Sequence, residues 1–376
     1  MKQLLYAFEF RGFETAPQSV KALMQPFASN SGPSMNALLR LTGPFIPLRD
    51  AYNFTNSPQG FTLEDASVLR NIYQGFVDNV ALIGVDTLRT ALTGLSFTIP
   101  GAGATGLPAV AIDAVENQVT ADIRNQLVDA IIASIPGTYG RCGGMAFSAF
   151  DFFQVGWPID RSVTSPPSTG DLRDYIWARL INSISSNGAT FLEWFMILKI
   201  LPVISTTASA ALGGIAGSVI GGPLGAAVGA LVAGKDDVLG MGGAGPLLGK
   251  TKGQLSSLAT MLAGNAAWPI GLIHGNAGSL TDEHQVLATG YQVVADNIAN
   301  LSYWDNVWDD DNAPKCRILR IDMTGGELNV SSADDPSCDD IKGIICESYS
   351  LTTPPVSLKL PWSDRQIVEW TTHDCL

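Results

Sequence analysis

The chain has 376 residues and a net charge of −13, with 46% hydrophobic and only 15% charged residues. This apolar composition excludes an intrinsically disordered chain. The negative net charge argues against nucleic acid as a partner, because phosphate backbones repel an acidic protein. The length suffices for one large domain or two smaller ones, each with a full hydrophobic core.

Residues 1–135 are predicted to form a mostly helical N-terminal region. An apolar run over residues 3–13 predicts a strand, and apolar residues then recur at helical spacing over 62–92 and 112–131. Between these two helices, residues 100–108 (Pro-Gly-Ala-Gly-Ala-Thr-Gly-Leu-Pro) are predicted to interrupt the helical structure.

The first residues also bear on localisation. No long apolar run follows Lys2, and Glu9 and Arg11 come too early for a Sec-type signal peptide. The protein is therefore expected to be cytoplasmic as made, with secretion or delivery into a target cell by a leaderless route as the alternative.

From residue 136 to residue 376 the pattern changes to a second domain that combines helices and strands. Helices are predicted at 143–154, 172–185 and 254–266, and strands at 269–273, 285–294, 317–323 and 341–349. Because the helices precede the strands without regular alternation, the predicted fold class is α+β.

A glycine-rich apolar insert occupies residues 201–250 of this domain. No charged residue occurs between 200 and 234, and glycine recurs every fourth residue from Gly213 to Gly229, which places these glycines on one face of a helix. Gly222-Pro223 divides the run into two helices, each short for a bilayer span. Residues 201–234 therefore predict a glycine-zipper-like hairpin that contacts or enters a membrane; an insert packed on the protein and a surface loop are the alternatives.

The segment Tyr-Gly-Arg-Cys-Gly-Gly-Met-Ala-Phe places Cys142 between glycines, directly before a helical pattern. A thiol at a helix N-terminus faces the positive end of the helix dipole, which favours the reactive thiolate. Gly143 and Gly144 would let backbone N–H groups approach an oxyanion closely. Cys142 is therefore a candidate nucleophile; a buried cysteine at a tight turn is the alternative.

His284 opens a predicted strand whose residues are almost all apolar or small, so its side chain is expected at the end of a buried strand. His274, near another strand end, is the weaker candidate for a catalytic base. Farther on, an acidic turn contains Asp309 and Asp310, and a carboxylate there could hold an imidazole in one tautomer. The acidic turn lacks the spacing of a calcium-binding loop, so no metal is expected.

Four of the five cysteines, Cys316, Cys338, Cys346 and Cys375, crowd into the final 61 residues, whereas Cys142 stands alone. Two interpretations are open: five free thiols in a reducing compartment, or two disulfides in the C-terminal part with Cys142 as the unpaired thiol.

In this order, the cysteine motif, the strand Trp-Pro-Ile-Gly-Leu-Ile, the motif His-Gln-Val-Leu-Ala-x-Gly-Tyr and the Asp-x-Asn-x-Pro turn resemble bacterial papain-like cysteine peptidase domains. The resemblance covers about residues 136–200 and 252–356. It implies a helix carrying the cysteine packed on an antiparallel sheet carrying the histidine. It further implies Cys142 as nucleophile, His284 as base and Asp310 as the residue that orients the base, or Asp309 if the register shifts by one. No cofactor is implied.

One position departs from the family. Papain-like enzymes carry a glutamine six residues before the cysteine, where it helps to bind the oxyanion, and here that position is Pro136. The side-chain donor to the oxyanion is therefore not identified from the sequence.

The predicted activity is hydrolysis of an amide bond in a protein or peptide through an acyl-enzyme on Cys142. Transglutaminase, deamidase and acyltransferase reactions use the same residues and stay open. A secreted or injected effector toxin would combine this activity with the apolar hairpin. The alternatives are a membrane-inserting or pore-type protein that works through residues 201–234, with the papain-like domain as a scaffold, and a pseudoenzyme that binds peptides.

Overall fold

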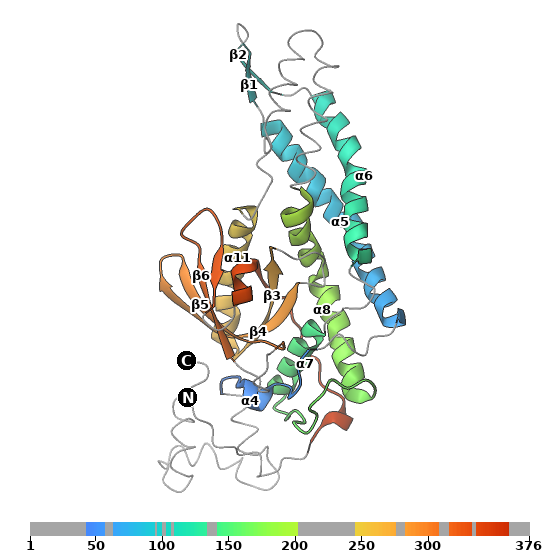
Figure 1. Cartoon of the computed structure of the whole chain (residues 1–376), viewed down its shortest axis with the longest axis vertical. Helices are drawn as coiled ribbons and strands as arrows, with labels where there is room; N and C mark the ends of the chain where they lie inside the picture. Colours follow the sequence, from blue (N-terminus) through green and yellow to red (C-terminus); the bar gives the residue numbers. More distant parts are fainter. Residues whose placement is uncertain are drawn as a thin grey trace.

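The computed structural model describes residues 43–56, 63–94, 96–99, 103–106, 109–133, 141–201, 245–275, 283–307, 316–332 and 336–360 (Figure 1). Within these residues the fold is α+β, as predicted: long helices pack beside one antiparallel sheet. The predicted strand at 3–13 and nearly all of the glycine-rich insert lie outside the described residues.

Two long helices, α5 (Leu63–Gly94) and α6 (Ala109–Ala133), form an antiparallel pair (Figure 1). Both helices were predicted, and both are confirmed. Between them, residues 103–106 of the predicted break form strand β2 (Gly103–Gly106), which pairs antiparallel with β1 (Ser96–Ile99). In α6 the fully buried side chains follow helical spacing: Val119, Ile123, Leu127 and Ile131.

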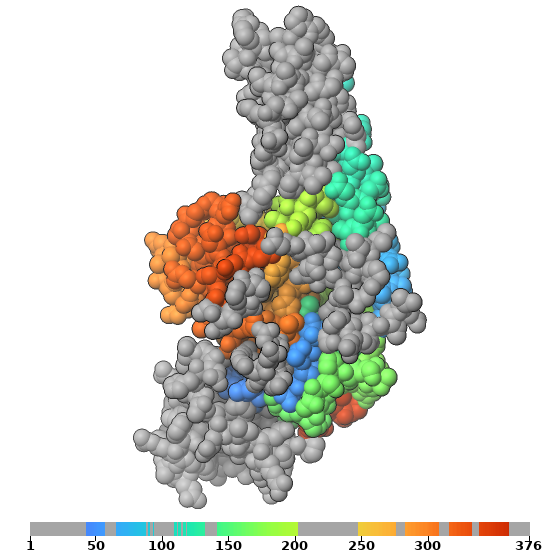
Figure 2. Space-filling view, viewed as in Figure 1, coloured from blue at the N-terminus to red at the C-terminus, as the bar shows by residue number. Residues whose placement is uncertain are grey.

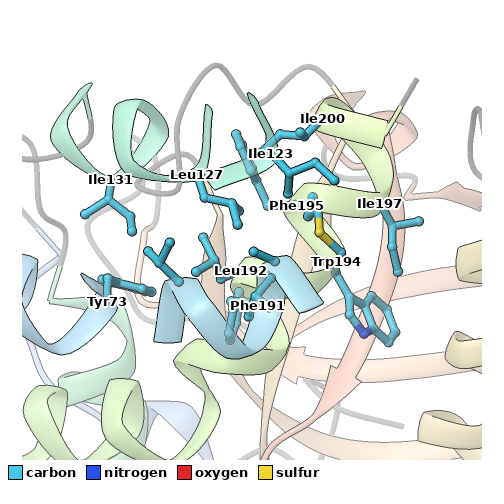
Figure 3. Close-up of a cluster of buried hydrophobic side chains, with 14 of the residues drawn as sticks. Tyr73, Ile123, Leu127, Ile131, Phe191, Leu192, Trp194, Phe195, Ile197 and Ile200 are labelled. Atoms are coloured by element: carbon cyan, nitrogen blue, oxygen red, sulfur yellow. The ribbon is translucent and has the colours of Figure 1, made fainter. Parts of the chain in front are cut away.

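The helix α8 (Asp171–Phe195) is longer than predicted, since it passes residue 185 and continues through the π-helical turn η2 (Met196–Ile200). Most of its last part is buried between α5, α6 and the sheet, although Glu193 and Lys199 are partly exposed (Figure 3). A helix with apolar side chains on most of its faces shows no clear amphipathic period. The apolar pattern therefore did not extend the predicted helix beyond residue 185.

The sheet has six antiparallel strands in the order β7-β6-β5-β4-β3-β8. The strands are β3 (Trp268–His274), β4 (His284–Ala295), β5 (Ile298–Trp304), β6 (Cys316–Asp322), β7 (Asn329–Ser331) and β8 (Ile341–Cys346). The four predicted strands are confirmed, whereas β5 and β7 were missed. A tight turn at Asp296-Asn297, with Asn297 at φ 60°, joins β4 to β5.

The helix α11 (Gly245–Gly264) covers the edge strand β8. The backbone N–H of Ile344 donates to Thr251 Oγ1 at 3.4 Å, and the N–H of Cys346 donates to Gln254 Oε1 at 3.0 Å. Side chains of α11 therefore satisfy N–H groups that a bare sheet edge would leave open to another strand.

The helix α7 (Cys142–Gln154) packs on α8 and on strands β3 and β4, and twelve of its thirteen residues are buried. A buried ion pair holds α7 to α8, with Arg179 Nε 2.5 Å from Asp151 Oδ2. The hydroxyls of Tyr175 and Tyr349 also donate to Asp151, at 2.7 and 2.6 Å. This network fixes the helix that begins with Cys142.

Residues 43–56, with the short helix α4 (Pro47–Asp50), pack against α7 although they precede it by almost a hundred residues. The rings of Phe45, Tyr52 and Phe54 are buried there, and the Tyr52 hydroxyl donates to Ser148 Oγ at 2.8 Å. Figure 2 shows this blue segment between the orange strands and the green helices. Part of the N-terminal region thus lies beside the cysteine-bearing helix.

The two glycines after Cys142 allow close packing of α7. A Cβ at Gly143 would clash with the Gln285 side chain, and a Cβ at Gly144 would clash with the backbone carbonyl of Ile176 in α8. The sequence had suggested that these glycines admit an oxyanion. In the structure, contact with the neighbouring elements is sufficient to explain them.

We expect Gly144→Ala to lower the free energy of unfolding by about 1–3 kcal/mol, because the backbone of Ile176 cannot yield as a flexible side chain would. Chemical denaturation measures the change. The matched control is Gly249→Ala in α11, where a Cβ meets nothing within 4 Å and alanine should stabilise the helix by about 0.5–1 kcal/mol. Equal effects of the two substitutions would show that packing at Gly144 is not tight.

Candidate functional site

Cys142 is the first residue of α7, so its thiol lies at the positive end of a helix of thirteen residues. The side chain is almost buried, at 9% exposure. The preceding residue, Arg141, has φ −89° and ψ 14° and supplies no side-chain cap to the helix.

His284 is the first residue of β4, as predicted, and its imidazole contacts Cys142 through a side-chain hydrogen bond. The other side of the ring faces Asp305, with Nε2 2.7 Å from Asp305 Oδ1. Since Asp305 engages Nε2, Nδ1 is the ring nitrogen left for the sulfur. The imidazole therefore lies between a thiol and a carboxylate.

The surroundings favour a charged imidazole. Burial, the strongest single influence, lowers the pKa of His284, but the charge and hydrogen bond of Asp305 and the contact with Cys142 outweigh it and raise the pKa to about 10. Such an imidazole is protonated at neutral pH. The protonated imidazole therefore places a positive charge beside the sulfur of Cys142.

Asp305 follows β5 directly and is held in place by its own loop. Its Oδ1 also accepts the backbone N–H of Val307 at 2.8 Å, and its Oδ2 lies 3.6 Å from Arg317 Nη1 on β6. These contacts orient the carboxylate toward His284.

A network of amide groups also ties neighbouring segments of the chain together at Cys142. Asn306 Nδ2 donates to the carbonyl of Cys142 at 3.1 Å and to the carbonyl of Gln285 at 2.8 Å. The N–H of Asn56 donates to the carbonyl of Asn306 at 2.6 Å, and Asn56 Oδ1 accepts the N–H of Arg141 at 2.6 Å. The start of α7, the end of β5 and the N-terminal segment are thereby tied together.

A buried carboxyl group lies behind this network. Gln285 Nε2 donates to Glu347 Oε1 and to Ser183 Oγ, both at 2.6 Å. Burial raises the pKa of Glu347 to about 8, although the bond from Gln285 opposes the shift. Glu347 is therefore mostly protonated and uncharged at neutral pH, which suits its 2% exposure.

The structure thus brings together Cys142 and His284, two of the three residues singled out from the sequence. Asp310 and its alternative Asp309 lie outside the described residues, and the carboxylate on the imidazole is that of Asp305. The weaker candidate base, His274, instead has its Nδ1 3.9 Å from Asp340 Oδ2.

A signal for Asp305 was present in the hairpin. The tight turn at Asp296-Asn297 pairs Leu287 with Trp304, so the residues just after Trp304 come level with the start of β4. Strand β5 was not predicted, and the carboxylate was expected in the later acidic turn, at Asp310 or Asp309.

Neither interpretation of the cysteines is correct. Cys316 is disulfide-bonded, whereas Cys142, Cys338 and Cys346 form no disulfide. Cys338 is buried beside the Tyr303 hydroxyl and Cys346 is half-buried at the end of β8, so both serve as small apolar side chains in the packing.

Within the described part of the chain, no three His, Cys, Asp or Glu side chains are grouped so that they could hold a metal ion. Among the same residues, no helix is both long and apolar enough to cross a membrane. Comparisons with family models, curated proteins and solved structures find no match to this chain. The site is therefore interpreted from its own residues and distances.

Proposed function

We propose that the protein is a papain-like thiol hydrolase that cleaves an amide bond in a protein or peptide, with Cys142 as nucleophile, His284 as base and acid, and Asp305 as the residue that orients His284. The observation that carries this proposal is the imidazole held between a thiol at a helix N-terminus and a buried carboxylate. A cysteine-bearing helix packed on an antiparallel sheet, with the histidine as the first residue of strand β4, supports the same class.

In the proposed reaction, the Cys142 thiolate attacks the carbonyl carbon, and the carbonyl π electrons move to the oxygen. The oxyanion then re-forms the double bond and the C–N bond breaks, while the His284 imidazolium gives its proton to the leaving amine. Water, deprotonated by the now neutral His284, attacks the thioester, and the sulfur leaves as thiolate. Asp305 keeps the imidazole in one orientation and stabilises its positive charge.

The test is to trap the acyl-enzyme. The protein is mixed with a digest of an unfolded protein, quenched in acid and analysed by intact-mass spectrometry. We expect a mass increase on Cys142 that matches a peptide fragment, is removed by hydroxylamine as a thioester, and is absent from Cys142→Ala. Absence of any adduct on Cys142, together with cleavage that survives Cys142→Ala, would refute the proposal. Adding a primary amine would show whether the acyl group passes to an amine instead of water.

A further inference from the structure

The proposed acyl transfer needs two hydrogen-bond donors for the oxyanion, and one is provided by the backbone. The first N–H groups of a helix have no partner within the helix. In α7 the first backbone hydrogen bond of the helix is made by Met145, whose N–H donates to the carbonyl of Arg141 at 2.8 Å. The N–H of Cys142 is therefore available to an oxyanion that forms beside its own sulfur.

The side-chain amide of Asn56 lies at this helix start. Its Oδ1 accepts the N–H of Arg141 at 2.6 Å. Because ψ of Arg141 is 14°, the N–H groups of Arg141 and Cys142 lie on the same side of the chain. The Asn56 amide therefore lies beside the N–H of Cys142.

The oxygen of this amide is used, but its nitrogen is not. Among the described residues, Asn56 Nδ2 has no hydrogen-bond acceptor, and the side chain is partly exposed. The group is thus a planar donor, fixed through its oxygen, with two N–H bonds available to a ligand.

Several contacts hold Asn56 in this position. Its own N–H donates to the carbonyl of Asn306, whose side chain in turn donates to the carbonyl of Cys142. Three residues earlier, Asn53 forms two hydrogen bonds with Arg161. Asn53 Nδ2 donates to the Arg161 carbonyl at 3.1 Å, and Arg161 Nη2 donates to Asn53 Oδ1 at 2.9 Å. A donor supported in this way needs no reorganisation during the reaction.

We propose that Asn56 Nδ2 is the side-chain donor to the oxyanion, and that it acts together with the N–H of Cys142. This inference rests on the proposed thiol hydrolase function. As the carbonyl π electrons move to oxygen, both N–H groups donate to it, and they release it when the C–N bond breaks. The catalytic centre is then completed by a residue 85 positions before Arg141, in a segment that lies outside the region of family resemblance.

The test uses Asn56→Asp. This variant keeps the oxygen that accepts the N–H of Arg141 but replaces the donor with a second acceptor. Two reactions of Cys142 are compared: acylation by p-nitrophenyl acetate, which passes through an oxyanion, and alkylation by iodoacetamide, which displaces iodide at a tetrahedral carbon and does not. We expect the acylation rate to fall at least about tenfold, since loss of one oxyanion donor typically lowers a rate by about 10²–10³-fold. The alkylation rate should stay within about threefold of the wild type.

The matched control is Asn329→Asp, an amide-to-carboxylate change at an exposed residue of strand β7, which should leave both rates unchanged. If Asn56→Asp acylates within about threefold of the wild type, or slows both reactions equally, Asn56 is not the donor. If the wild-type Cys142 is not acylated and its alkylation is indifferent to His284→Ala, the proposed function fails as well. The two failures are therefore distinguishable.

Discussion

Asp305→Ala is expected to lower the rate of acyl-enzyme formation by about 10²-fold or more, because His284 would lose both its hydrogen-bond acceptor and its charge partner. Asp305→Asn separates the two contributions. It keeps an oxygen for His284 Nε2–H but removes the charge, so we expect a smaller loss at acidic pH and a changed pH profile. Stopped-flow measurement of acylation across pH checks both variants.

The direction of the pH change follows from the charges at His284. In the wild type, the imidazolium persists until the pH reaches its raised pKa of about 10, so the alkaline limb of the rate profile should fall there. Without the carboxylate charge, burial acts against the imidazolium with less opposition, and in Asp305→Asn the limb should move toward acid by about 1–3 pH units. A limb that stays in place would show that Asp305 does not set the protonation of His284.

Asp322 offers a matched control for Asp305. In both residues, Oδ1 accepts the backbone N–H of the residue two positions later. The donor is Thr324 for Asp322, at 2.9 Å, and Val307 for Asp305, at 2.8 Å. Asp322→Ala therefore removes the same kind of turn from the next strand without touching the imidazole. We expect it to leave the acylation rate and its pH profile unchanged.

Glu347→Gln is expected to change how stability depends on pH. Glu347 keeps its proton in the folded protein up to a pKa of about 8, against 4.5 for an ordinary glutamic acid, so folding takes up a proton between these values. Rising pH therefore opposes folding of the wild type, by about 1 kcal/mol for each pH unit across this interval. Below pH 4.5 this contribution is constant, and above about pH 8 it does not grow further.

Glutamine in place of Glu347 keeps a carbonyl oxygen for Gln285 Nε2 and cannot ionise. The difference in the free energy of unfolding, variant minus wild type, should therefore increase from pH 4.5 to about pH 8 and then level off. Denaturant titrations at several pH values measure it, with the exposed Glu327→Gln as control. A difference that is flat with pH would mean that Glu347 is ionised in the folded protein.

Local patterns in the sequence predicted the elements that have a clear period, such as the buried stripe of α6, and the ends of two elements where Cys142 and His284 lie. Strand β5 was missed although its buried residues alternate, because polar Asn300 and Ser302 interrupt the apolar run. The family resemblance had implied Asp310, in the later acidic turn, as the residue that orients His284, whereas the structure places Asp305 there.

Contacts between distant segments could not be predicted in this way. Nothing near Asn56 in the sequence indicates that it hydrogen-bonds Arg141, 85 residues later, because that contact depends on the packing of residues 43–56 against α7. The close fit of Gly144 against α8 is likewise a property of two helices that meet only in the folded chain.

The pairing of Cys142 with His284 is tested most simply by labelling the folded protein with an electrophilic thiol probe at about pH 6. Labelling of each cysteine is quantified by peptide mass spectrometry. Cys346 is an internal reference, because burial raises its pKa to about 11 and it should not react at this pH. We expect selective labelling of Cys142 that is lost in Cys142→Ala and strongly reduced in His284→Ala. Labelling of Cys142 that is no faster than that of Cys346, or that is unaffected by His284→Ala, would contradict a catalytic thiolate–imidazolium pair.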